Sequence, residues 1–503
     1  MTAPTLEPPI VARARTHLDQ TAVVSPEGTF TYAELLDASA RIAAALLDGR
    51  ADLGEARVAF LAPPGWDYIA VQWGVWRAGG IAVPLAVSHP PAELEYVVRD
   101  ADAEIVVAHP EFADVLRPVA ERNGRRFLLT DELRSAEPAT LPAVTEERRA
   151  MIVYTSGTTG RPKGVVSTHA NLRAQITTLV DAWGWTADDR TLLVLPLHHV
   201  HGIVNVLACA LWSGAACEVL PRFDADAAWE AVESGRLTLF MAVPTVYRRL
   251  IAAYDEADAE RQKRMAEGCR RMRLMVSGSA ALPVQTLERW REISGHTLLE
   301  RYGMTEIGMA LSNPLHGERR PGSVGVPLPG VEARLVDDEG GEVEPGTPGE
   351  VEIRGPSVFL EYWRRPEATA EAFRDGWFRT GDVGVVEDGY WRLLGRRSVD
   401  IIKTGGYKVS ALEIEEVLRE HPAIAECAVV GVDDPDWGER VCVAVECGAD
   451  APELDALQAW ARERLAPYKL PREIRRVDAL PRNAMGKVVK PEVAKLFAAA
   501  PRG

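Results

Sequence analysis

Short apolar segments alternate with helical stretches through the first half of the chain, and this order constrains the fold more than any other feature. Segments 39–47 and 68–78 have the composition of helices. Apolar strands separated by helices are typical of parallel sheets that helices cover on both faces. The sequence therefore predicts an α/β fold with parallel-rich sheets. The apolar segments expected to form strands are 57–61, 82–84, 104–108, 192–195, 237–243 and 273–276.

The pattern changes after about Pro321. Glycine and proline become frequent up to GTPG at 346–349, and the strand-like segments 349–354 and 390–394 predict a small β-rich subdomain. A second break falls at 395–400. We expect residues 1–395 to form a large N-terminal domain, and residues 396–503 to form a small, mobile α+β domain. Within the latter, helices are expected at 410–420 and 454–465, and strands at 425–430 and 440–446.

Length and composition indicate how many domains the chain has and which partners it is not expected to bind. A chain of 503 residues suggests two or more domains, and 47% hydrophobic residues suit a large core. The net charge of −16 argues against nonspecific binding to nucleic acid or to an anionic membrane. Six cysteines are scattered without a CxxC pair, and the N-terminus lacks an apolar signal-type core. We therefore expect a cytoplasmic protein with neither nucleic acid nor membrane as a partner.

The strongest local signal for ligand binding is TSGTTGRPKG at 155–164, which follows a strand-like segment at 151–154. Glycines let the backbone approach phosphate oxygens, hydroxyls add donors, and Lys163 adds a point charge. The spacing differs from the GxxxxGK[ST] pattern, which disfavours a P-loop kinase or GTPase. A solvated turn is the alternative. The residues predicted to bind phosphate are Thr155, Ser156, Gly157, Thr158, Thr159 and Lys163.

Five segments, in this order, resemble the motifs of the adenylate-forming superfamily of acyl-CoA synthetases, firefly-type luciferases and peptide-synthetase adenylation domains. They are TSGTTGRPKG at 155–164, YGMTE at 302–306, RTGD at 379–382, GR at 395–396 with the stretch 400–406, and PRNAMGK at 481–487. The resemblance covers nearly the whole chain. It implies an AMP-forming acid–thiol ligase that uses ATP, Mg²⁺ and coenzyme A and passes through an acyl-adenylate.

Adenylation brings together two anions, a carboxylate and the α-phosphate of ATP, so the site must neutralise their charge. The residues of the second motif suit this task. Glu306 is the natural magnesium ligand, because a hard cation prefers oxygen, and a helix-cap carboxylate is the alternative. The resemblance implies that Thr305 contacts the α-phosphate and that Tyr302 belongs to the nucleotide site.

The later motifs supply the remaining groups. A carboxylate has two acceptor oxygens and suits a vicinal diol, so Asp382 resembles the residue that binds the ribose hydroxyls. Arg396 is expected near ribose or phosphate. The resemblance implies that Lys487 bridges the attacking carboxylate and the α-phosphate. Gly405 and Gly406 correspond to a loop that relatives use against the pantetheine arm of coenzyme A.

The hinge departs from the common pattern, because Ser398 stands where many relatives carry Asp or Lys, and Asp400 is the nearest acid. The residue that acts as pivot is therefore open. We expect residues from about 396 onward to rotate between the two half-reactions, since two sets of groups cannot occupy one site at once.

Three polar residues near the expected acyl channel point to the substrate. His201, Ser277 and Arg301 would form a cationic pocket that could fork a second carboxylate. This combination, together with SVDIIKTGGYKVSALE at 398–413, resembles the malonyl-CoA and methylmalonyl-CoA synthetases. Malonate or methylmalonate is therefore the expected substrate. The alternative is that Arg301 pairs with a structural acid and that the histidines pack in the core.

Three other functions remain open. The chain could activate another small carboxylic acid, or it could be a standalone adenylation enzyme that loads a carrier protein. It ends at Gly503 without an evident carrier domain, which favours free coenzyme A. A non-catalytic nucleotide-binding protein would be expected to have lost some of the reactive residue types, and all four are present. They are Lys163, Glu306, Asp382 and Lys487.

Overall fold

The computed structural model of the protein describes residues 7–155, 162–404, 407–447, 452–483 and 487–498. Its contacts divide the chain into two compact units. The first comprises Met1–Arg320, Pro327–Glu332 and Ile353–Phe378, and the second comprises Pro321–Val326, Ala333–Glu352 and Arg379–Gly503. The small β-rich part is thus grouped with the C-terminal part. The expected domain boundary between residues 395 and 396 falls inside the second unit and stays a prediction.

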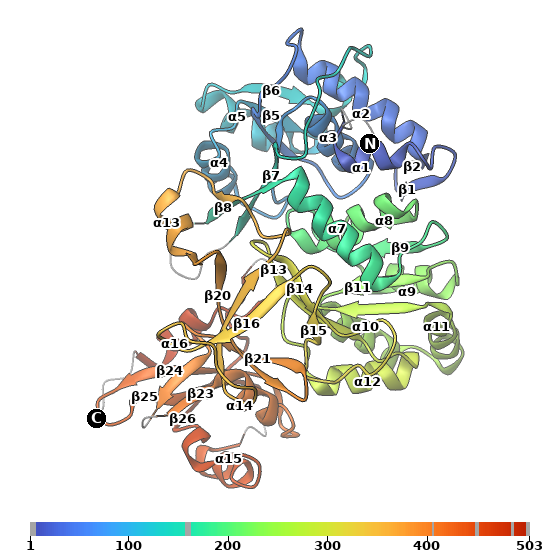
Figure 1. Ribbon diagram of the computed structural model, residues 1–503. Helices are drawn as coiled ribbons and strands as arrows, with labels where there is room; N and C mark the ends of the chain where they lie inside the picture. The colour runs from blue at the N-terminus through green and yellow to red at the C-terminus, as the bar shows by residue number, and fades with distance from the viewer. Residues whose placement is uncertain (1–6, 156–161, 405–406, 448–451, 484–486, 499–503) are drawn as a thin grey trace. The chain divides into compact units, whose positions relative to one another are not determined.

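A mostly parallel seven-stranded sheet lies near the N-terminus of the first unit (Figure 1). Five adjacent strands run parallel, and the two strands at one side of the sheet are antiparallel to their neighbours. In sheet order the strands are β18 (Glu361–Tyr362), β8 (Lys163–Thr168), β7 (Arg149–Thr155), β4 (Ile81–Pro84), β3 (Arg57–Leu61), β5 (Ile105–Ala108) and β6 (Arg126–Leu129).

A nine-stranded sheet forms the other half of the first unit. The central strands from β1 to β13 are parallel, and β2 and β14 pair antiparallel at the two sides. In order the strands are β15 (Val326–Pro327), β14 (Gly308–Ser312), β13 (Leu299–Met304), β12 (Leu274–Ser277), β11 (Leu239–Ala242), β9 (Arg190–Leu193), β10 (Ala216–Val219), β1 (Thr21–Ser25) and β2 (Gly28–Thr31). All six apolar segments named from the sequence form strands in these two sheets, which confirms the predicted parallel-rich α/β class.

Helices connect and cover these strands. Helix α3 (Trp66–Arg77) is buried on every side, and it packs against β1 of one sheet and β3 of the other, so one core joins the two sheets. The other helical elements are α1 (Pro9–Ala14), α2 (Tyr32–Leu47), α4 (Pro91–Asp100), η1 (Pro110–Phe112), α5 (Ala113–Arg122), α6 (Thr130–Arg134), α7 (His169–Trp183), η2 (His201–Ala208), α8 (Cys209–Ser213), α9 (Ala225–Glu233), α10 (Pro244–Glu256), α11 (Ala259–Arg271), α12 (Val284–Ser294) and α13 (Pro366–Glu371).

The second unit is smaller and contains most of two five-stranded sheets, although β19 (Phe373–Arg374) belongs to the first unit. One has the order β16 (Glu332–Val336), β17 (Gly349–Arg354), β20 (Trp377–Glu387), β19, with β21 (Tyr390–Arg396) also on β20. The other has the order β23 (Tyr407–Ser410), β22 (Ile401–Thr404), β25 (Gly438–Cys447), β24 (Ile424–Asp434), with β26 (Glu473–Val477) also on β25. Its helices are α14 (Ala411–Leu418), α15 (Leu454–Ala461), η3 (Pro467–Lys469) and α16 (Lys490–Ala498). The predicted α+β character of this part is confirmed.

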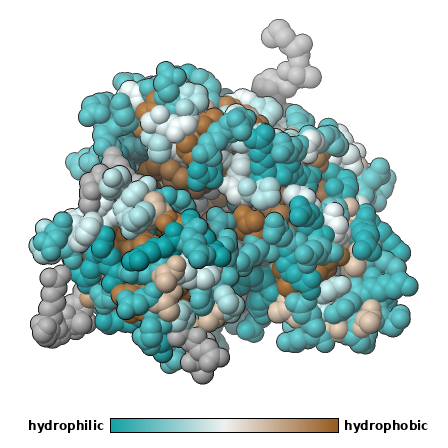
Figure 2. Space-filling view, turned by 90° about the horizontal axis from the view of Figure 1, so that it is seen from below, coloured by the Kyte–Doolittle hydropathy of each residue, from teal (hydrophilic) through white to brown (hydrophobic). Residues whose placement is uncertain are grey.

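Polar and charged residues cover most of the face shown in Figure 2, and hydrophobic residues appear there as separate small areas. Within the described ranges, no helix is both long and apolar enough to cross a membrane.

Candidate active site

The predicted phosphate-binding segment lies between two antiparallel strands. Strand β7 ends at Thr155, β8 begins at Lys163, and these two residues are paired in register. A P-loop leads instead from a strand into a helix, so the structure agrees with the exclusion made from spacing. The Tyr96 hydroxyl donates to the Pro162 carbonyl at 2.7 Å, which fixes one end of the segment. Four of the predicted residues, Ser156, Gly157, Thr158 and Thr159, lie outside the described residues.

Lys163, Tyr362 and Glu306 form a connected group. The Lys163 ammonium lies 5.0 Å from the centroid of the Tyr362 ring, and the Tyr362 hydroxyl donates to Glu306 Oε1 at 3.0 Å. Glu306 is buried, and its carbonyl accepts a hydrogen bond from the Phe359 N–H at 2.7 Å. The ring therefore lies between the two predicted phosphate-site charges. Sequence reasoning missed Tyr362, because only the pairing of β18 with β8 brings it beside Lys163.

The YGMTE motif forms the end of β13 and the turn into β14. Gly303 is required there, since a Cβ at this position would lie 2.1 Å from the Gly308 carbonyl oxygen. Thr305 is half-buried in the turn, and Tyr302 is buried in β13. The tight turn thus holds Glu306 and Thr305 at the carboxyl end of β13 in the nine-stranded sheet.

Arg301, one residue before this motif, is buried without a partner. Its side chain is 3% exposed, and among the described residues it makes no hydrogen bond or ion pair. Nε and Nη2, the two nitrogens on one edge of the guanidinium, are both buried and unsatisfied. Burial lowers the pKa of Arg301 to about 9, although Glu300 and Tyr247 oppose the shift. Such a charge is costly in an apolar interior and calls for an anionic ligand.

The loop after β12 brings the three predicted acyl-site residues together. Ser277 ends β12 opposite Glu300, and Gly278 lies against the Arg301 guanidinium, because a Cβ on Gly278 would be 2.4 Å from Arg301 Cζ. The next residue, Ser279, has its hydroxyl 3.1 Å from His201 Nδ1. Ser277 Oγ is fully buried and has no hydrogen-bond partner in the described part of the chain. Sequence reasoning noted the hydroxyls here but missed the role of Gly278.

His201 begins a π-helical turn, η2, and π-helical turns are frequent at functional sites. The two preceding histidines, His198 and His199, have ring centroids 4.1 Å apart. Burial lowers the pKa of His198 to about 4, with a smaller contribution from His89, so its ring is neutral near pH 7. His201 is thus the histidine that the structure brings to the predicted acyl pocket.

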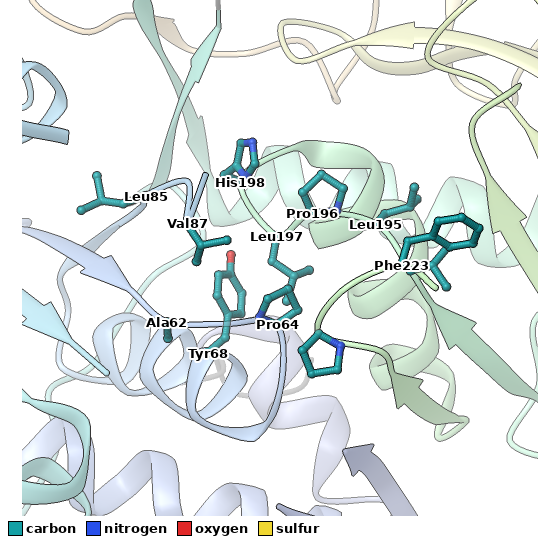
Figure 3. A pocket seen from close by; sticks show the side chains of 12 residues that line it. Ala62, Pro64, Tyr68, Leu85, Val87, Leu195, Pro196, Leu197, His198 and Phe223 are labelled. Carbon is teal, nitrogen blue, oxygen red and sulfur yellow. The ribbon is translucent and has the colours of Figure 1, made fainter. Parts of the chain in front are cut away.

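A cavity of about 170 Å³ opens beside the loop that leads to His201 (Figure 3). Its walls come from the loops after β3, β4, β9 and β10, at the carboxyl ends of parallel strands, where α/β folds commonly bind ligands. Its lining does not include Arg301, Ser277 or His201. The lining residues are Ala62, Pro64, Tyr68, Leu85, Val87, Val194, Leu195, Pro196, Leu197, His198, Pro221 and Phe223.

In the second unit, Asp382 and Arg396 lie side by side. They are paired across β20 and β21, and Arg396 Nε lies 3.2 Å from Asp382 Oδ1. The Asp382 N–H donates to Thr380 Oγ1 at 3.1 Å, and Arg396 also donates to the Thr380 carbonyl. The two residues predicted to contact the ribose are therefore adjacent.

Lys487 is exposed at the end of a narrow turn. Its N–H donates to Asn483 Oδ1 at 3.0 Å, and its carbonyl accepts from the Asn483 N–H at 2.9 Å. Gly405 and Gly406 lie outside the described residues, between the paired ends of β22 and β23 at Thr404 and Tyr407. In the predicted hinge, Ser398 is exposed and Asp400 is buried.

Comparison with protein families and known proteins identifies the family of the chain. The AMP-binding enzyme family model matches residues 10–363, and the AMP-binding enzyme C-terminal domain model matches residues 413–487. The mitochondrial malonate–CoA ligase of Mus musculus is 50% identical, covering 97% of this chain and 90% of that protein. The malonate–CoA ligase of Arabidopsis thaliana is 40% identical, covering 96% and 87%. The cytoplasmic location expected for this chain stays a prediction.

Solved structures are similar over the same length. The ATP-bound MatB of Rhodopseudomonas palustris has a TM-score of 0.90 at 36% identity, covering 98% of this chain and 99% of that chain. The AMP complex of the Bacillus subtilis O-succinylbenzoate coenzyme A synthetase has a TM-score of 0.85 at 28% identity, covering 98% of both. The predicted adenylate-forming resemblance is thus confirmed: the chain belongs to the AMP-binding enzyme family and is an AMP-forming acyl-CoA ligase.

Proposed function

We propose that this protein ligates malonate, or methylmalonate, to coenzyme A in an ATP-dependent reaction that passes through the acyl-adenylate and releases AMP and pyrophosphate. The observation that carries this proposal is the buried Arg301 guanidinium, which has no carboxylate partner among the described residues. The malonate–CoA ligases among the relatives support the same substrate class.

The geometry of Arg301 suits a second carboxylate. Nε and Nη2 together present the parallel pair of N–H groups that bind both oxygens of a carboxylate. Gly278 leaves room for the guanidinium, and the buried Ser277 hydroxyl offers a further hydrogen bond beside it. A bound dicarboxylate would restore the hydrogen bonds and the counter-charge that the free pocket lacks.

The same arrangement discriminates against monocarboxylic acids. Acetate, propionate and butyrate have one carboxylate, which must react with ATP, so each would leave Arg301 unpaired in a buried site. The free enzyme already carries this unpaired buried charge, so a dicarboxylate gains several kcal/mol by pairing with it, whereas a monocarboxylate gains nothing there. Arg301 therefore favours a dicarboxylate over monocarboxylates of similar size.

For adenylation, we assign roles to the residues that match the family motifs. Lys163 and the turn around Thr305 neutralise and align the phosphates, and the Asp382–Arg396 pair holds the ribose. Glu306 would bind Mg²⁺, which offsets phosphate charge when present. Mg²⁺ typically takes one or two carboxylates plus substrate phosphates, so a single buried Glu306 fits it, and the described residues contain no cluster of three or more metal-binding side chains.

Lys487 then completes the first half-reaction. Its ammonium contacts the attacking carboxylate and the α-phosphate, and so holds two anions within reaction distance. In the second half-reaction, rotation of the C-terminal domain withdraws Lys487 and brings Gly405 and Gly406 to the pantetheine arm.

A panel of carboxylates with ATP and coenzyme A tests the proposal, read by pyrophosphate release and by the mass of the thioester. We expect malonate and methylmalonate to give higher kcat/KM than acetate, propionate, butyrate or succinate. A preference for butyrate would refute the dicarboxylate assignment. Pyrophosphate release without a CoA thioester, in the presence of a carrier protein that becomes acylated, would refute coenzyme A as the acceptor.

A further inference from the structure

The segment that carries Lys487 is followed directly by a second, buried lysine. Lys490 is the first residue of α16, and its side chain is 12% exposed. Its ammonium lies 2.5 Å from Asp400 Oδ1 and 2.8 Å from Glu415 Oε1. Burial by itself would lower the pKa of Lys490, but the two carboxylates outweigh it and raise the pKa, so the ammonium stays charged. Two ion pairs thus fix the chain three residues after Lys487.

Asp400 connects this lysine to the segment that bears Arg396. Asp400 Oδ2 accepts a hydrogen bond from the Arg396 N–H at 2.9 Å, and the Asp400 N–H donates to the Arg396 carbonyl at 2.7 Å. Gly395 packs so closely that a Cβ there would be 2.4 Å from Asp400 Cβ. One carboxylate therefore links the backbone of Arg396 to the side chain of Lys490.

Glu415 anchors the same lysine to the C-terminal sheet. Its Oε1 accepts from the Val429 N–H at 2.8 Å, and its Oε2 lies 3.3 Å from Arg419 Nη2. Arg419 in turn pairs with Glu426 at 2.7 Å, and Arg482 Nη2 lies 3.7 Å from Glu426 Oε2. Alternating charges thus hold the Lys487 segment on both sides, through Arg482 before it and Lys490 after it.

We propose that Lys490 is a positioning residue for adenylation: it fixes the backbone of the Lys487 turn relative to Arg396 by bridging Asp400 and Glu415. The proposal rests on the role assigned to Lys487 above. Lys487 is exposed, so its reach into a site depends on where its backbone is held. A displacement of about 1 Å in such a group can cost about 100-fold in rate.

The test compares Lys490→Met with Lys495→Met, a matched control on the same helix whose lysine is exposed and pairs only locally with Glu492. Both half-reactions are measured: acid-dependent ATP–pyrophosphate exchange, and thioester formation from preformed acyl-adenylate. For Lys490→Met we expect kcat of exchange to fall at least ~30-fold, with KM for ATP and the thioester step within ~3-fold of wild type. Lys490→Arg, which keeps the charge, should recover part of the loss, and Lys495→Met should match wild type.

A double variant with balanced charges shows whether a loss of activity comes from a misplaced Lys487 segment or from misfolding. Lys490→Met with Glu415→Gln removes both charges of one pair while the Gln carbonyl can still accept from Val429 N–H, so it should fold even if the single variant does not. We expect its exchange activity to stay low. Hydrogen exchange at the Asn483 and Val489 amides, which close the base of the turn, should speed up in both variants.

Recovery of exchange in the double variant, or equal losses in both half-reactions, would overturn the proposal. The assays use whichever acid the wild type activates best, so an error in the malonate assignment does not affect them. Lys487→Ala is run in parallel. If it leaves exchange intact, the role of Lys487 fails, and a specific loss in Lys490→Met would then need another explanation.

Discussion

At the scale of single residues, the account depends on one arginine whose environment differs from that of the other arginines. Most arginines in the described chain contact a carboxylate, as Arg273 does at Asp189 with an N–O distance of 2.6 Å. Arg301 is among the most buried, and it forms no ion pair with an acid among the described residues. The alternative that Arg301 pairs with a structural acid is therefore not supported. The buried charge has two consequences, one for the pH dependence of kcat/KM and one for the packing of Gly278.

The first consequence concerns pH. Because burial lowers the pKa of Arg301 to about 9, the free enzyme loses this charge as the pH rises through 9. Since kcat/KM reports the free enzyme, kcat/KM for malonate should fall about tenfold per unit above that pH. Butyrate should lack this alkaline limb. A pH profile on both acids checks this, and parallel alkaline limbs on the two would contradict it.

The second consequence concerns Gly278. Gly278→Ala places a methyl group 2.4 Å from Arg301 Cζ, so the guanidinium must move. We expect kcat/KM for malonate to fall at least ~10-fold, since alignment with the distal carboxylate is lost. A double-mutant cycle with Arg301→Leu provides the control: Gly278→Ala should add little in that background. Full additivity would show that Gly278 acts independently of Arg301.

At the scale of elements, most strands and helices could be predicted from apolar runs, because buried parallel strands carry that pattern on both faces. The start of α2 was missed by seven residues, although Thr31 and Glu34 form a capping box there. Tyr362 could not be found this way. It lies in a two-residue strand about 200 positions from Lys163 in the chain, and only sheet register brings the two together. The same reason hid the contact between Gly278 and Arg301.

Tyr362 gives a prediction at this scale. Tyr362→Phe removes the hydroxyl that donates to Glu306 and keeps the ring beside Lys163. Because a hydrogen bond to a charged group contributes about 1.5–3 kcal/mol, we expect the Mg²⁺ concentration for half-maximal exchange to change and kcat to fall ~10-fold. The matched control is Tyr154→Phe, which removes a 2.8 Å bond to Asp100. Equal effects in both variants would indicate a loss of stability only.

At the scale of the whole molecule, each unit holds part of the predicted machinery. The residues predicted for the acyl site and Glu306 belong to the first unit, whereas Asp382, Arg396 and Lys487 belong to the second. The order of motifs in the sequence predicted the candidate site residues. It did not predict that contacts would group the β-rich subdomain with the second unit. Sequence pattern cannot decide such a grouping, because it depends on contacts between strands far apart in the chain.

The proposed rotation has its own test. Ser398 is exposed in the turn between Arg396 and Asp400, and in the described structure its N–H takes no part in a backbone hydrogen bond. Ser398→Pro should therefore restrict the turn without removing such a bond, because proline fixes its own φ and limits the conformation of Arg397. Overall turnover should fall at least ~10-fold while one half-reaction stays within ~3-fold of wild type. Unchanged overall turnover would argue against a hinge at this turn.

The central claim is that Arg301 binds the distal carboxylate of malonate or methylmalonate. The most direct measurement is kcat/KM of wild type, Arg301→Leu and Arg301→Lys on malonate, methylmalonate and butyrate. We expect Arg301→Leu to lower kcat/KM for malonate at least ~100-fold, about 3 kcal/mol, while relative activity on butyrate rises. Arg301→Lys should restore little, since a point charge cannot reproduce the planar fork. If Arg301→Leu keeps the preference of the wild type for malonate over butyrate, the account is contradicted.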